Sequence, residues 1–263
     1  MRKLLWGMVL PLALGLAFSA PSPAQTKKPA EASKAAASGP AHDISGVWMD
    51  DHARPNKVEE RYWIYEFTPE EPPMSAWGQE QFVKAKSGFG PHPFPIKETN
   101  DPVYLSCQPA GFPRAYTHPF PMQILQVPGE VLVVFEWDSL RHQIFTDGRQ
   151  HETSLGPSYM GDSIGHWEGD TLVADTVNFN DKTWLDRMGH PHSDQLHVIE
   201  RIRRVDHDHL VDDLTIDDPK AYTKPWTAHL RFALHPKWTL QEQFCEDENT
   251  FEGIESNEVK PAK

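Results

Sequence analysis

The second half of the chain repeats one pattern: strand-forming residues, a tight turn, then more strand-forming residues. Four stretches have this form (123–137, 163–179, 196–216 and 228–244), and another run over 140–146 ends at Asp147-Gly148. Asp-Gly and Pro-Gly pairs favour hairpin turns. Successive hairpins with almost no helix between them predict an all-β fold, an antiparallel meander closed into a barrel. A β-sandwich is the alternative that this pattern leaves open.

The first half adds fewer elements. Residues 44–48 and 62–67 predict two more strands, the second rich in aromatic β-formers. Ser75 followed by 76–86 predicts one short helix with Ser75 as its N-cap. Residues 87–120 are rich in Pro, Gly and aromatic residues, so we expect a long irregular segment that wraps the sheet.

The N-terminus has the pattern of an export signal. Arg2 and Lys3 precede an uncharged apolar run over 4–20, and small residues follow. We therefore expect a signal peptide over 1–24, with cleavage near residue 20 as the alternative. A flexible linker over 25–42, a single β-barrel domain over 43–253 and a flexible tail over 254–263 complete the predicted organisation. The predicted location is periplasmic or secreted.

Cys107 and Cys245 are the two cysteines of the chain. In an oxidising compartment, a distant pair of this kind usually forms a disulfide. The alternative is a reactive or metal-binding cysteine, but neither has a Cys-x-x-Cys neighbour. We predict the disulfide, which would tie the segment entering the barrel to its last strand.

The formal net charge of −13 limits the partners of the chain. Contacts to phosphate need clustered Lys and Arg, so we expect no nucleic-acid partner. No second long apolar run follows the signal, so we expect no membrane insertion of the mature chain. A small-molecule ligand is the partner that remains.

Two sequence patterns carry a resemblance. GDSIGHWEGDTLVADTVNFNDKTWLDRMGHPHSDQLHVIERIRR (161–204), with PPMSAWGQEQF and FCEDEN, resembles a group of secreted bacterial proteins over most of 43–250. That group brings no established activity, so no catalytic residues carry over. Gly46-Val47-Trp48 is similar to the Gly-x-Trp that opens lipocalin-type barrels. This second resemblance implies a calycin-like barrel.

Strand alternation places two carboxylates among apolar residues. Glu200 shares a strand face with Val198 and Ile202, and Glu242 shares one with Trp238 and Leu240. Inside a barrel, such a pair could divide into a catalytic acid and base. The alternative is that each carboxylate forms a structural bridge with an arginine.

His142 is the third candidate for acid–base chemistry. It lies on a predicted strand, on the same face as Leu140 and Ile144. It could be a base that reaches the cavity. The alternative is a core histidine whose hydrogen bonds are satisfied by its neighbours.

The densest polar segment, 184–194, joins two predicted strands and should lie at the barrel mouth. Its Trp184 and Asp186, with Arg201 on the following strand, are our candidate binding residues. His190 and His192 would face one way in extended backbone, as metal ligands do, and would suit Zn, Fe or Mn. Alternatively, these histidines bond the backbone of the loop.

Three functions follow. The first is an exported lyase, isomerase or hydrolase that uses interior carboxylates and histidine on an apolar or aromatic substrate. The second is a non-catalytic binding protein for an apolar small molecule, and the third is a metalloprotein with histidine ligands. The sequence contains no Gly-x-Ser-x-Gly elbow, Walker A loop or dinucleotide-binding Gly-x-Gly-x-x-Gly.

Overall fold

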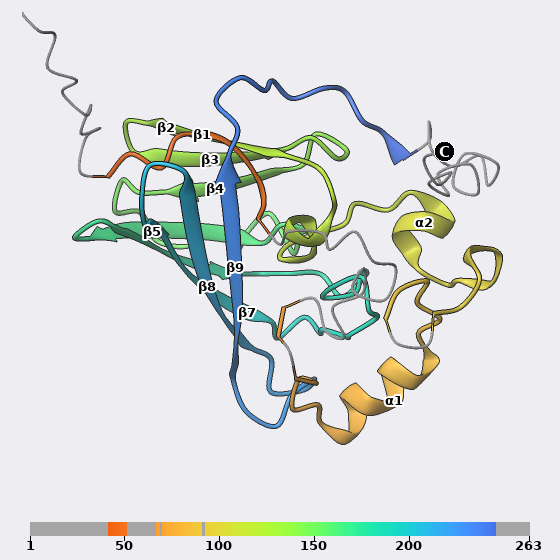
Figure 1. Cartoon of the computed structure of the whole chain (residues 1–263). Helices are drawn as coiled ribbons and strands as arrows, with labels where there is room; N and C mark the ends of the chain where they lie inside the picture. Colours follow the sequence, from red (N-terminus) through yellow and green to blue (C-terminus); the bar gives the residue numbers. More distant parts are fainter. Residues whose placement is uncertain (1–41, 52–66, 69, 91–92, 246–263) are drawn as a thin grey trace, which may run out of the picture. The chain divides into compact units, whose positions relative to one another are not determined.

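The structure is a computed structural model that describes residues 42–51, 67–68, 70–90 and 93–245 (Figure 1). The predicted signal peptide, nearly all of the linker, all but the last residue of the strand predicted over 62–67, and the C-terminal tail lie outside these residues. No helix in the described ranges is long and apolar enough to cross a membrane.

The described residues form a closed barrel, so the sandwich alternative is wrong and the predicted barrel is confirmed. Each strand pairs with the next along the chain, and β1 pairs with β9 to close the ring. The nine described strands are β1 (Gly46–Asp50), β2 (Met122–Val127), β3 (Glu130–Phe135), β4 (Arg141–Phe145), β5 (Asp162–Glu168), β6 (Thr171–Val177), β7 (His197–Arg204), β8 (His209–Asp217) and β9 (Trp226–Leu234).

Alternation decides which side chains fill the barrel. On β7, β8 and β9 every second residue is buried, and these residues are mostly aliphatic or aromatic. They join Trp48, Ile124 and Leu172 in one hydrophobic core. The period of two follows from the pleat, because successive side chains of a strand point to opposite faces. A polar residue in this inward register is therefore buried whatever its chemistry.

Two features of the sheet differ from the sequence prediction. The β4–β5 pair is parallel, with Ile144 opposite Ser163, because residues 146–161 run back along the barrel before β5 begins. The barrel is therefore mixed rather than wholly antiparallel. Residues 235–244 form no strand after β9, because both edges of β9 are already paired with β8 and β1. The prediction of a strand over 238–244, in the second half of the fourth hairpin, is therefore wrong.

The helices lie in the wrapping segment and the stretch before it. The helix α1 (Ala76–Lys84) begins at Ser75, whose hydroxyl accepts a hydrogen bond from the Gly78 N–H at 3.0 Å, as predicted. The other described helices are η2 (Ile96–Glu98), α2 (Pro102–Ser106) and η3 (Arg114–Thr117). Figure 1 shows α1 and α2 beside the barrel strands.

The predicted disulfide between Cys107 and Cys245 is present and joins positions 138 residues apart. Cys107 directly follows α2, and Cys245 lies beyond β9 rather than within the last strand. The bridge fastens the wrapping segment to the chain that leaves the barrel. In the chain-entropy model, closing so long a loop stabilises the fold by roughly 5 kcal/mol.

Candidate functional site

A chain of buried ionisable side chains crosses the barrel interior. His142 Nε2 lies 2.7 Å from Glu200 Oε2, and the Tyr116 hydroxyl donates to Glu200 Oε1 at 3.0 Å. The side chains of His142 and Glu200 are essentially inaccessible to solvent. The prediction that Glu200 and His142 point inward is therefore confirmed, and their partners turn out to be each other and a tyrosine rather than an arginine.

Three different elements bring these groups together. His142 is in the inward register of β4, opposite Val133, and Glu200 is in the inward register of β7, between Ala174 and Leu214. Tyr116 comes from η3, in the wrapping segment. No two of the three are neighbours in sequence, so only closure of the barrel assembles them.

Asp212, in the inward register of β8, is a fourth buried ionisable group. Burial raises the pKa of this carboxyl well above its usual value, and the nearby Glu200 charge raises it further. The carboxyl also interacts with the Glu200 side chain, which raises its pKa, and with the Arg201 backbone N–H, which lowers it. A neutral carboxylic acid in such a place can donate a proton to a ligand atom.

Tyr116 is held as a phenol by the same surroundings. Burial raises the pKa of its hydroxyl well above 10, and the charges of Glu200 and Asp212 raise it further. The phenol therefore keeps its proton and donates a hydrogen bond to Glu200. Glu200 thus receives its hydrogen bonds from titratable side chains.

The imidazole of His142 has one engaged and one open nitrogen. Its Nε2 meets Glu200, and its Nδ1 has no hydrogen-bond partner among the described residues. Phe112 stacks on the ring, with 4.1 Å between centroids and 10° between planes. If Nε2 carries the proton that meets the Glu200 carboxylate, Nδ1 presents a lone pair. This is the arrangement of a general base whose ring is oriented by a carboxylate.

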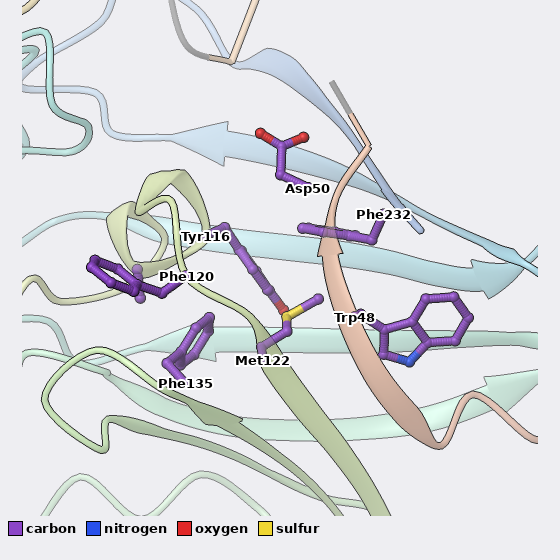
Figure 2. A pocket seen from close by; sticks show the side chains of 8 residues that line it. Trp48, Asp50, Tyr116, Phe120, Met122, Phe135 and Phe232 are labelled. Atoms are coloured by element: carbon purple, nitrogen blue, oxygen red, sulfur yellow. The ribbon is translucent and has the colours of Figure 1, made fainter. Parts of the chain in front are cut away.

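Tyr116 also lines one small hollow. Figure 2 shows the Tyr116 ring among Phe120, Met122, Phe135 and Phe232. The Phe135 and Phe232 rings lie 5.3 and 5.5 Å from it, centroid to centroid. The hollow has a volume of about 10 Å³, about enough for one water molecule. The interior chain is therefore closed to solvent in this structure.

Glu242 and Arg201 are not where the sequence analysis expected them. Glu242 is exposed, because residues 235–244 leave the barrel instead of forming a strand whose face turns inward. Arg201 is exposed in the outward register of β7 and pairs with Glu168 at 2.8 Å. Both side chains therefore lie outside the barrel interior.

The loop over 184–194 holds its own buried pair. His190 Nδ1 lies 2.5 Å from Asp186 Oδ2, and Asp186 Oδ1 accepts from the N–H groups of Met188 and His190. Phe82 of α1 stacks on the His190 ring at 4.7 Å. The carboxylate of Asp186 is therefore used to shape its own loop rather than to meet a ligand.

His192 does not share a ligand position with His190. Its Nε2 lies 3.1 Å from the Thr183 hydroxyl, and its Nδ1 faces the Ser193 carbonyl. Burial lowers the pKa of this imidazole below 6.5. In the described part of the chain, no group of three or more His, Cys, Asp or Glu side chains could hold a metal ion. The predicted metal pair is therefore used inside the loop.

Sequence reasoning missed Asp212 and Tyr116. Asp212 could have been found, since the alternation rule that singled out Glu200 also puts Asp212 on one face with Leu210 and Leu214. Tyr116 could not, because it lies in an irregular segment without a period that would give its direction. Trp184, a predicted binding residue, is half-buried and lines a surface cleft beside α1.

Comparison with known proteins adds no relative: no family model, curated protein or solved structure matches the chain. The site is therefore interpreted from its own geometry.

Proposed function

We propose that the protein is an exported enzyme that moves a proton on a small apolar or aromatic substrate, as a lyase or isomerase does. The observation that carries the proposal is the interior chain of His142, Glu200 and Tyr116 beside Asp212, whose carboxyl pKa is raised by burial and by Glu200. Ionisable groups whose surroundings hold them in different protonation states are how a site performs acid and base chemistry at one pH.

In the proposed reaction, His142 Nδ1 takes a proton from a C–H group next to a substrate carbonyl. The electron pair of that bond forms an enol double bond, and the carbonyl oxygen takes the proton of Asp212. Glu200 stabilises the imidazolium that forms. In a ketone with a C=C bond between its β and γ carbons, the imidazolium then gives its proton to the γ carbon while Asp212 takes back the enol proton, which completes an isomerisation and restores both groups. The four groups include no serine or cysteine nucleophile, so hydrolysis through a covalent intermediate has no support here.

Substrate access in this proposal is along the wall that carries Tyr116. The Tyr116 side chain lines the hollow, and its hydroxyl donates a hydrogen bond to Glu200. A ligand that displaces the aromatic side chains around this ring reaches the chain directly. The lining of Trp48, Phe120, Phe135 and Phe232 suits an apolar or aromatic molecule.

Export is part of the proposal. It rests on the apolar N-terminal run after Arg2 and Lys3, together with the Cys107–Cys245 bridge. Disulfides form and persist in oxidising compartments and are rare in the cytosol. We also propose that the barrel is lipocalin-like, because Gly46-Val47-Trp48 resembles the Gly-x-Trp that opens lipocalin-type barrels.

The test is proton exchange in D₂O. The purified chain is incubated with a panel of small aryl ketones, and NMR follows replacement of the C–H next to the carbonyl by C–D. We expect Glu200→Gln and His142→Gln to slow the exchange about 100-fold or more. Glu242→Gln is the matched control, because it removes an exposed carboxylate outside the barrel. Wild-type exchange no faster than buffer, or full exchange in Glu200→Gln, would overturn the proposal.

A non-catalytic binding protein is the second candidate function. The observation that favours it is the hollow of about 10 Å³, which leaves the interior closed. In that case His142, Glu200 and Tyr116 form a buried structural network, and ligands bind elsewhere on the barrel. The exchange experiment separates the two functions, because a binder gives no exchange that depends on Glu200.

A further inference from the structure

A second site lies outside the barrel, between α1 and the loop over 181–192. It is a surface cleft of about 330 Å³, which is within the range that holds small-molecule ligands. One wall comes from α1 through Trp77, Gln81 and Lys84, and the other from Lys182, Trp184 and His192. The cleft therefore joins two segments that are about a hundred residues apart.

Close backbone packing shapes this cleft. A Cβ on Gly78 would lie 2.2 Å from the Ala221 carbonyl oxygen, so glycine lets α1 sit directly on the 218–222 turn. Gly189 has a φ of +94°, and a Cβ there would lie 2.7 Å from Ala85 Cβ. The loop and the end of α1 thus meet without a side chain between them, which fixes the two walls relative to each other.

Two indole rings line the cleft, and each has a cation over it. The Lys220 ammonium lies 4.7 Å from the Trp77 ring centroid, and the Arg114 guanidinium lies 5.6 Å from that of Trp184. Arg114 is itself held by two hydrogen bonds to the buried Asp101 carboxylate, at 2.9 and 2.6 Å. Such contacts attract and hold the rings, so both aromatic walls are formed before a ligand arrives.

The charges at the cleft are unevenly available. Lys84 is occupied by Glu80, at 2.8 Å along α1. Lys182 is exposed and makes no ion pair within the described residues, although Asp181 is its neighbour. Burial lowers the pKa of His192 below 6.5, so it contributes a neutral polar ring at neutral pH. Lys182 is thus the cation that the cleft offers to a ligand.

From these observations we infer that the cleft binds a small aromatic carboxylate. Its ring lies against Trp77 and Trp184, and its carboxylate meets the Lys182 ammonium. A ring between indoles gains stacking and burial, and a charge-assisted hydrogen bond fixes the anion at one end. This inference goes beyond the proposed interior chemistry and rests on none of the groups in the interior chain.

The test uses isothermal titration calorimetry on the full purified chain, with 2-naphthoate and its neutral amide, 2-naphthamide, as probes. We expect 2-naphthoate to bind at one site. The neutral amide should bind at least about fivefold more weakly. Lys182→Gln should weaken 2-naphthoate about five- to tenfold and leave the amide unchanged, since it removes one charge-assisted contact. Added salt should weaken 2-naphthoate binding because the cleft is exposed to solvent.

Lys224→Gln is the matched control, since Lys224 is an exposed lysine that does not line the cleft. Trp77→Leu should weaken the binding of both probes, which would show that their rings lie against the aromatic wall. Glu200→Gln should leave 2-naphthoate binding intact, so that failure of the interior proposal and failure of this one are told apart. Absence of saturable binding, equal affinity for the two probes, or full affinity in Lys182→Gln would overturn the inference.

Discussion

Two buried histidine–carboxylate pairs in this protein look alike and are built differently. His142–Glu200 and His190–Asp186 have contacts of 2.7 and 2.5 Å, and each imidazole stacks on a phenylalanine ring. The first joins residues 58 apart across the barrel, whereas the second joins residues four apart within one loop.

The second oxygen of each carboxylate separates the pairs. Asp186 Oδ1 accepts from two backbone N–H groups of its own loop. Glu200 Oε1 accepts from the Tyr116 phenol, and Asp212, whose pKa is raised by burial and by Glu200, lies nearby. Backbone donors tie a carboxylate to the shape of a loop, whereas titratable donors link its charge to other protons. We therefore assign structure to the loop pair and propose chemistry for the barrel pair.

The largest expected effect comes from removing Glu200 altogether. Glu200→Ala leaves His142 Nε2 and the Tyr116 hydroxyl without partners in the interior, and we expect it to lower the free energy of unfolding by about 3–5 kcal/mol. Denaturant unfolding measures this loss. If the interior side chains are not required for folding, replacing all three with Glu200→Leu, His142→Leu and Tyr116→Phe should restore much of the stability. A triple variant as unstable as Glu200→Ala would mean that these three side chains are needed for the stability of the fold.

The next effect compares the conservative variants of the two pairs. Asp186→Asn places an amide group among donors that need acceptors, and we expect it to cost about 1–3 kcal/mol of unfolding free energy while proton exchange continues. Glu200→Gln should show the reverse, with a smaller loss of stability and a loss of exchange. Both quantities are measured on the same preparations. Equal losses of exchange in the two variants would remove the distinction between the pairs.

The sequence predicts the inward register well and the loops poorly. Alternation on β4 and β7 places His142 and Glu200 inside because the pleat leaves no choice of face once the strand is paired. The same reasoning fails for Glu242, since alternation assumes a strand, and closure by β1 leaves no partner for one after β9. Closure is a long-range event that no local pattern records.

The loop over 184–194 shows the other limit. The spacing of His190 and His192 predicts a shared direction only in extended backbone. Asp186 instead folds this loop around its own carboxylate, so that His190 meets Asp186 and His192 meets Thr183. A residue pattern gives the available groups, but hydrogen bonds to the backbone decide where they point.

The third effect is a pH dependence of stability that comes from Asp212, beside the barrel pair. The folded pKa of Asp212 is raised, so the folded protein holds this proton more tightly than the unfolded chain, whose reference value is 3.8. The stability from this group is therefore present below about pH 3.8 and is lost as pH rises through the folded pKa. Asp212→Asn should remove that slope and become more stable than wild type as pH rises.

Unfolding free energies measured between pH 4 and 8 check this expectation. Asp170→Asn is the control, because it removes an exposed carboxyl in the turn between β5 and β6, outside the barrel interior. Parallel curves for Asp212→Asn and wild type would show that Asp212 is not the neutral acid that the proposed reaction needs.

The smallest expected effect concerns the two stacked rings. Phe112→Leu and Phe82→Leu each remove a face-to-face contact with a paired imidazole, and we expect each lost stack to contribute about 0.5–1.5 kcal/mol beyond the loss of buried area. Phe112 is almost fully buried and Phe82 is half-buried, so Phe112→Leu should cost more. The decisive comparison is in proton exchange, because Phe112 orients the ring whose Nδ1 is the proposed base. Phe112→Leu should slow exchange and Phe82→Leu should not, and equal exchange rates in the two variants would mean that the His142 ring needs no orientation for its chemistry.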